Sequence, residues 1–218
     1  MKKLLLLAVA VGALYMYKPG LFPSFNKSGA YGSNGKPQVL LFTAANCNGY
    51  CTKARQELTD RNIDFTELKL DGNDENTNRF HKLGGNNMIP LLVAGSLSVP
   101  GYDKGMYASV LAQNFGDKAL SQAEQSYYSR HFKADGTPTI YMYGATWCGF
   151  CTVMRNEMEK RNIDFDEIDV DTTADRTEVE NTMELAALPV TYVGYKRIVG
   201  AESVDPVLAA LKSGVKRM

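Results

Sequence analysis

The chain of 218 residues contains one segment twice, about 100 residues apart. Residues 51–71 (CTKARQELTDRNIDFTELKLD) align without gaps on residues 151–171 (CTVMRNEMEKRNIDFDEIDVD), and 11 of the 21 aligned residues are identical. This period is too long for a solenoid repeat and matches a duplicated small domain. Because the chain has room for two domains of about 80 residues, each with a modest core, we expect two related domains in tandem.

A pair of cysteines opens the second copy. Cys148 and Cys151 stand between the apolar run 139–143 and the helix-like segment 152–158. At the N-terminus of a helix, the free amides and the positive end of the helix dipole stabilise a thiolate. A structural zinc site would need two more ligands nearby, and no Cys or His follows Cys151 in the sequence. The pattern therefore favours a redox-active pair.

The first copy has one extra residue between its cysteines. Cys47 and Cys51 follow the apolar run 39–42, and Cys51 aligns with Cys151, so the extra residue displaces Cys47. A bulge or a wider first helical turn must absorb the longer spacing, and Gly49 permits it. We expect Cys47 to gain less from the helix amides, which predicts a divergent and weaker redox site.

Alternating apolar residues and turn signals predict the same order of elements in both copies: strand, helix, strand, helix, strand, strand, helix. In the second copy, the expected strands are 139–143, 165–170, 190–193 and 197–199, and the expected helices end near 161–162, run from about 174 to 187, and begin at Asp205. Thr173 is the expected cap of the middle helix, and Pro206 suits the first turn of the last. The first copy has a matching last helix from Asp103.

This order, with two cysteines after the first strand, resembles the glutaredoxin branch of the thioredoxin fold. In the second copy, the matching features are Trp147 directly before the first cysteine, Leu188-Pro189 at the family's cis-proline, and residues 199–202 at its Gly-Gly-x-Asp turn. In the first copy, they are Ile89-Pro90 and residues 100–103. The resemblance implies an α/β fold of two tandem thioredoxin-fold domains, each a four-stranded mixed sheet with flanking helices, after an N-terminal apolar segment.

The resemblance also implies thiol–disulfide exchange on protein or low-molecular-weight disulfides and thiols. Cys148 would attack as the thiolate and Cys151 would resolve the mixed disulfide, with Cys47 and Cys51 as the second redox pair. The residues implied to border the substrate groove are Trp147, Phe150, Leu188, Pro189, Ile89 and Pro90. No metal and no tightly bound cofactor is expected. In the first copy, Asn46 stands in place of the tryptophan, which removes one wall of the groove.

Glutathione stays open as a co-substrate. Many glutaredoxins carry a lysine three residues before the first cysteine, where it helps to bind a glutathione carboxylate. Ala145 and Ala44 occupy those positions here. Dithiol exchange does not depend on that lysine.

Two other functions are alternatives to the enzyme. A non-catalytic scaffold would use the pairs as structural disulfides, but disulfides that close such small loops add little stability. A metal or iron–sulfur protein would have to bring all four cysteines together across two domains. His81 and His131 are far from both motifs in the sequence, and we expect them at the surface, as we do Arg155 among the helix charges. Net charge is zero, and without a long basic block nucleic-acid binding has no electrostatic support.

The N-terminal segment predicts export. Lys2 and Lys3 precede 14 apolar residues, 4–17, and Lys18 ends the run, which is the layout of a secretory signal. A spanning helix needs ~20 residues, although Lys18 can snorkel and lengthen this one. A cleaved signal with a periplasmic protein and an inner-membrane anchor facing the periplasm are the two alternatives, and both place the domains outside the cytoplasm.

Composition divides the chain into five segments. Residues 24–37 are rich in Ser, Gly, Asn and Lys, which is typical of a flexible spacer. The expected segments are 1–18, a signal peptide or membrane anchor; 19–36, a flexible spacer; 37–117, the first glutaredoxin-like domain; 118–136, a linker with a short helix at 122–128; and 137–218, the second domain.

Overall fold

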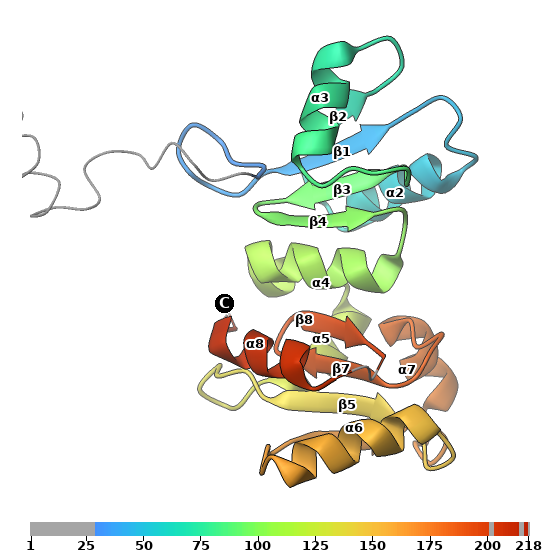
Figure 1. Ribbon diagram of the computed structural model, residues 1–218, viewed down its shortest axis with the longest axis vertical. Coiled ribbons are helices and arrows are strands. Elements are labelled where there is room, and N and C mark those ends of the chain that lie inside the picture. Colours follow the sequence, from blue (N-terminus) through green and yellow to red (C-terminus); the bar gives the residue numbers. More distant parts are fainter. Residues whose placement is uncertain (1–28, 201–202, 214–215, 218) are drawn as a thin grey trace, which may run out of the picture.

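The computed structural model describes residues 29–200, 203–213 and 216–217, which form two four-stranded sheets with flanking helices (Figure 1). Each sheet belongs to one copy of the repeat, so the expected fold of two tandem thioredoxin-fold domains is confirmed. The N-terminal segment 1–18 lies outside the described residues. In the part of the chain that is described, no helix is long and apolar enough to cross a membrane.

The first domain has the strand order β2-β1-β3-β4. Its elements are β1 (Val39–Thr43), α2 (Tyr50–Asp60), β2 (Thr66–Lys69), α3 (Asp74–Lys82), β3 (Leu91–Ala94), β4 (Leu97–Pro100) and α4 (Lys104–Phe115). β1 is parallel to β2 and antiparallel to β3, which is antiparallel to β4. All five residues of β1 are buried, because α2 and α4 pack on one face of the sheet and α3 packs on the other.

The second domain repeats this topology, with the strand order β6-β5-β7-β8. Its elements are β5 (Ile140–Gly144), α6 (Gly149–Lys160), β6 (Asp166–Asp169), α7 (Arg176–Met183), β7 (Val190–Val193), β8 (Lys196–Val199) and α8 (Asp205–Ser213). Helix α7 is shorter than expected, and Asp175 rather than Thr173 precedes it. It ends at Met183 because Glu184 adopts the left-handed conformation, with φ of 52°.

Helix α4 lies between the two sheets and is shared by both cores (Figure 1). Tyr107 and Leu111 belong to the core of the first domain, whereas Ala108 and Ala112 belong to that of the second. On the same helix, the Ser109 hydroxyl donates to the carbonyl of Tyr195 at 2.8 Å and accepts from the Arg197 amide at 3.0 Å. The domains are therefore joined by a packed helix and by hydrogen bonds to the second hairpin.

The interval 118–136, expected to be a linker, is largely part of the second domain's core. It contains α5 (Gln122–Tyr128), at the position expected for a short helix, and the 3₁₀ turn Ser129–His131, and its first residues belong to another 3₁₀ turn, Gly116–Ala119. Tyr127 and Tyr128 are buried in the same cluster as the second cysteine pair. Burial of these aromatic side chains explains why the segment is ordered rather than a free connection.

His131 is buried, so the expectation of a surface position was wrong for this residue; His81 is exposed, as expected. The ring nitrogens of His131 lie 3.2 Å from the Gly194 carbonyl and 3.0 Å from the Tyr143 hydroxyl, and its ring stacks on Tyr192 with the ring centroids 4.4 Å apart. Burial lowers the pKa of His131 to about 3. His131 is therefore a neutral core residue that ties the α5 segment to the sheet.

The start of the described chain is also packed, although residues 19–36 were expected to be a flexible spacer. Ala30 is fully buried, and its amide donates to the Gly95 carbonyl at 2.7 Å. The amide of Gln38 donates in turn to the Ala30 carbonyl at 2.8 Å. From residue 29 onward, the chain therefore extends the first domain beside the β3–β4 turn.

Candidate active site

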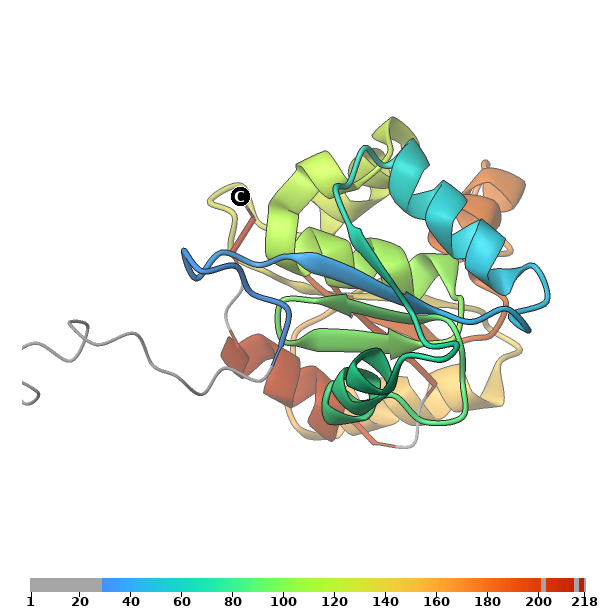
Figure 2. The ribbon, with the colours of Figure 1, turned by 90° about the horizontal axis from the view of Figure 1, so that it is seen from above.

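Each cysteine pair forms a disulfide at the carboxyl end of its domain's first strand. The Cα–Cα distances are 5.7 Å for Cys47–Cys51 and 5.2 Å for Cys148–Cys151. β1 and β5 run in the same direction, so the two disulfide-bearing loops lie at the same side of the molecule in both views (Figures 1 and 2). The fold therefore presents two disulfide centres on one side.

In the second domain, Cys148 is the N-cap residue of α6. Its Sγ accepts a hydrogen bond from the Cys151 amide at 3.1 Å, and the Cys148 carbonyl accepts from the Thr152 amide at 3.1 Å. Amide donors directed at a sulfur stabilise its negative charge after the disulfide is reduced. Cys151 is fully buried one helical step further on, so Cys148 is the sulfur nearer to solvent.

In the first domain, the extra residue moves Cys47 outside the helix. Gly49 is the N-cap of α2, with φ of 85°, and Asn48 also has a positive φ of 45°. No side chain caps this helix, so Cys47 lacks the amide contact that Cys148 makes. The predicted role of Gly49 is confirmed, since a left-handed N-cap is a conformation that glycine adopts without strain.

Both predicted proline positions carry cis peptide bonds, Ile89–Pro90 and Leu188–Pro189. In each domain, the carbonyl of the proline accepts from the amide of a glycine eleven residues later, at 2.7 Å from Gly101 and 2.9 Å from Gly200. Leu188 packs against the cluster that contains Cys148 and Cys151, whereas Ile89 packs against a cluster without cysteines.

The surface beside the second disulfide is apolar. Trp147, Phe150 and Val153 are 71%, 69% and 48% exposed. The indole Nε1–H of Trp147 donates to Asp171, which also pairs with Arg176. Trp147 is therefore an anchored surface residue rather than a core residue. Large exposed apolar side chains around a disulfide are typical of a substrate-binding rim.

An ion pair lies beneath each cysteine loop, whereas the sequence predicted Arg155 on a solvated face. Arg155 pairs with Glu167 at 2.8 Å and donates to the carbonyl of Ala145 at 3.0 Å, on the turn that leads to Cys148. In the first domain, Arg55 pairs with Glu67 at 2.9 Å. Hydrogen bonds from Arg55 lower the pKa of Glu67. The signal was available, because both partners are identical in the two copies.

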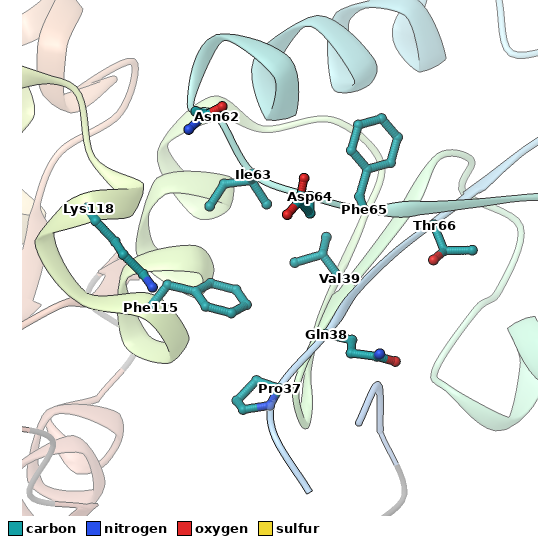
Figure 3. A pocket seen from close by; sticks show the side chains of 10 residues that line it. All are labelled: Pro37, Gln38, Val39, Asn62, Ile63, Asp64, Phe65, Thr66, Phe115 and Lys118. Carbon is teal, nitrogen blue, oxygen red and sulfur yellow. The ribbon is translucent and has the colours of Figure 1, made fainter. Parts of the chain in front are cut away.

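The other repeated residues lie at the opposite end of each sheet. In the first domain, Asn62–Phe65 line a hollow of about 540 Å³ together with Val39, where β1 begins (Figure 3). In the second, residues 162–165 line a hollow of about 600 Å³. Asn62 and Asn162 both have positive φ and end the preceding helix. Their identity in the two copies is therefore explained by chain reversal and packing, away from the cysteines.

The fold and the paired cysteines define a thioredoxin-fold protein with a disulfide centre in each domain. The sequence profile of the glutaredoxin family matches residues 39–99 and 139–198, together more than half of the chain. A glutaredoxin of Pseudomonas aeruginosa is 33% identical over 67 residues, which are 31% of this chain and 79% of that protein. The chain therefore belongs to the glutaredoxin family.

Two solved glutaredoxin structures are similar to part of the chain. That of Archaeoglobus fulgidus has a TM-score of 0.32 at 22% identity and covers 36% of this chain and 89% of its own. The buckwheat glutaredoxin–glutathione complex has a TM-score of 0.35 at 18% identity and covers 43% of this chain and 86% of its own. Family membership rests on the two sequence matches.

Proposed function

We propose that the protein is an exported thiol–disulfide oxidoreductase that reduces, forms or isomerises disulfides of proteins or small molecules, with its main centre in the second domain. The observation that carries the proposal is the hydrogen bond from the Cys151 amide to the Cys148 sulfur at the start of α6. A sulfur in that position is stabilised as the thiolate, which is the attacking species in disulfide exchange.

The exchange has two steps. The Cys148 thiolate attacks one sulfur of a substrate disulfide, forming a mixed disulfide and releasing the other substrate sulfur as a thiolate. Cys151 loses its proton and attacks Cys148, which releases the second substrate sulfur and closes the Cys148–Cys151 disulfide. Two electrons pass from the cysteine pair to the substrate, and the reverse sequence oxidises a dithiol. Trp147, Phe150 and the Leu188–Pro189 segment would border the groove in which the substrate disulfide lies.

We propose glutathione as a reductant of the pair. The buckwheat relative is a glutaredoxin–glutathione complex, which supports this choice by family likeness. Ala145 and Ala44 stand where many glutaredoxins carry a carboxylate-binding lysine, so a low preference for glutathione over other thiols is expected.

Two double variants of the full chain test this function. Cys47→Ser/Cys51→Ser leaves only the second pair, and it should keep turnover on a protein disulfide close to that of the unaltered protein. Cys148→Ser/Cys151→Ser leaves only the first pair and should lose most of the turnover. In the reduced variants, Cys148 should be alkylated at lower pH than Cys47, because only Cys148 receives a helix amide. Equal turnover and equal alkylation profiles would show that the two centres are equivalent.

Export is proposed from the lysine-led apolar segment 4–17, which lies outside the described residues. A fusion of alkaline phosphatase after residue 36 tests it, because that enzyme folds only where its disulfides form. We expect an active fusion in cells, and loss of activity when residues 2–18 are deleted from the same fusion. An inactive full-length fusion, produced in the same amount, would contradict export.

A further inference from the structure

The two disulfide centres differ in charge at equivalent positions of the repeat. Lys69, the last residue of β2, aligns with Asp169, the last residue of β6, and Lys53 aligns with Val153. The ion pair beneath each loop is the same in both domains and contributes no difference. The first centre therefore has two cations where the second has one anion and one apolar residue.

In the first domain, one of these two cations, Lys69, lines a hollow that reaches the disulfide. The hollow has a volume of about 380 Å³, and its lining includes Cys47, Cys51, Arg55 and Lys69. Lys69 stands level with Thr43 at the ends of the paired strands, directly before the cysteine loop. Within the described residues, the Lys69 ammonium group forms no ion pair, whereas Arg55 is held by Glu67. Lys69 is thus the cation of this hollow that is not held in an ion pair, while Asp71, which also lines the hollow, accepts from the amide of Ala45 at 2.8 Å.

In the second domain, the corresponding place is acidic. Asp169 stands level with Gly144 and accepts hydrogen bonds from the amide of Thr146 at 3.2 Å and from its hydroxyl at 2.8 Å. Hydrogen bonds from Thr146 lower the pKa of Asp169, so this carboxylate is charged at neutral pH. Asp171, which accepts from Trp147 and pairs with Arg176, has its counterpart in Asp71 of the first domain and contributes no difference. An anion that approaches this disulfide meets like charge and an apolar rim.

We infer that the first-domain centre selects small anionic thiols and disulfides, such as carboxylate-bearing ones, whereas the second-domain centre discriminates against them. The inference rests on the proposed exchange function and assigns a substrate class to each centre. An anionic thiolate attacks one sulfur of Cys47–Cys51, forms a mixed disulfide with it and frees the other cysteine sulfur as a thiolate. A second thiolate attacks the reagent sulfur of this mixed disulfide, which breaks its bond to the cysteine, frees the cysteine thiolate and releases the two reagent molecules as their disulfide. Lys69 favours the approach of the anion, because exposed charges act over about one Debye length, ~10 Å at 0.1 M salt.

The two double variants described above, each with one disulfide left, provide the test. Each is reduced by thioglycolate (anionic) and by cysteamine (cationic), and each rate is divided by the rate with neutral 2-mercaptoethanol. The anionic-to-cationic ratio should be about tenfold higher for the first centre than for the second at low ionic strength, and the difference should shrink in 0.5 M salt. Comparing centres with the same reagents cancels the reagents' own reactivities.

Charge substitutions then locate the effect. Lys69→Glu should lower the ratio of the first centre severalfold, and Lys69→Gln by about half as much on a logarithmic scale. Asp169→Asn keeps an acceptor for Thr146 and should raise the ratio of the second centre. Lys118→Glu is the matched control, because Lys118 lines the hollow at the opposite end of the sheet and should leave the ratio unchanged.

The outcomes distinguish failure of the charge selection from failure of the proposed exchange function. Equal ratios for the two centres, or a ratio that Lys69→Glu and Lys69→Gln leave unchanged, would overturn the charge selection while the exchange function stands. Failure of both disulfides to react with the neutral thiol would instead contradict the exchange function itself.

Discussion

Replacing Cys148 by serine should lower turnover on a protein disulfide by roughly a thousandfold, because a serine hydroxyl is not ionised near neutral pH and cannot form the mixed disulfide. The amide of Cys151 and the start of α6 would remain as they are, so the loss reports the nucleophile rather than the fold. The measurement is the rate of disulfide reduction with a thiol reductant, together with circular dichroism to compare the folds.

Cys151→Ser is the partner experiment. This variant keeps the attacking sulfur but lacks the resolving one, so it should accumulate a mixed disulfide with substrate that mass spectrometry detects. Cys47→Ser in the first domain is the matched control and should leave most of the turnover. If the Cys148→Ser protein kept wild-type turnover, or if Cys148→Ser rather than Cys151→Ser trapped the substrate, the assigned roles would be reversed or wrong.

The features predicted correctly from the sequence are those with a local signal. The repeat and its periodicity predicted the order of elements in both domains, and Asp103 begins α4 as a cap, accepting from the Met106 amide at 2.8 Å. The extra residue beside Gly49 was also located correctly, because a change of spacing at a helix start must appear in the backbone there. In these cases, a few neighbouring residues determine the conformation.

The features missed depend on partners far apart in the sequence. His131 is neutral because it is buried, and its ring nitrogen donates to the carbonyl of Gly194, 63 residues away in the sequence. Arg155 is drawn to Ala145 and Glu167 rather than to solvent. Helix α4 is buried on nearly all sides because the second domain covers the face that the first leaves open, and only its apolar composition on every side hinted at this.

The same dependence on distant partners gives the largest stability effect that we expect. Arg61, at the end of α2, forms two hydrogen bonds of 2.7 Å with Glu124 of α5, and a third of 2.9 Å with the carbonyl of Ala119. The side chains of Arg61 and Glu124 are only 5% and 4% exposed. Arg61→Ala should therefore lower the free energy of unfolding by roughly 3–5 kcal/mol, because it leaves the Glu124 carboxylate buried without its partner. Urea unfolding at pH 7 measures this loss.

The repeat supplies the matched control. Arg161 occupies the same place in the second copy, but it is 42% exposed and pairs with Glu157 and Asp205 at the surface, so Arg161→Ala should cost no more than about 1 kcal/mol. Replacing both buried partners, as in Arg61→Met/Glu124→Met, should recover part of the loss, since the buried charge of Glu124 is then removed, while Glu57 still lacks its partner Arg61. Equal losses of unfolding free energy in Arg61→Ala and Arg161→Ala would show that the buried ion pair between α2 and α5 stabilises the protein no more than the exposed pairs of Arg161 do.

The pH dependence gives a second readout of the same pair. Burial by itself would raise the pKa of Glu124, but the hydrogen bonds and charge of Arg61 outweigh it and hold the pKa below the ordinary value of 4.5. The contribution of the pair is therefore complete above that value and is lost as the pH falls through the lower pKa of the folded state. In Arg61→Ala the burial of Glu124 is opposed only by its hydrogen bonds with Ser121, so the carboxyl of the variant binds its proton at higher pH and then ceases to be a buried charge. The stability difference between the two proteins should accordingly be largest near neutral pH and shrink on acidification, whereas a loss due only to missing packing of the Arg61 side chain would be independent of pH.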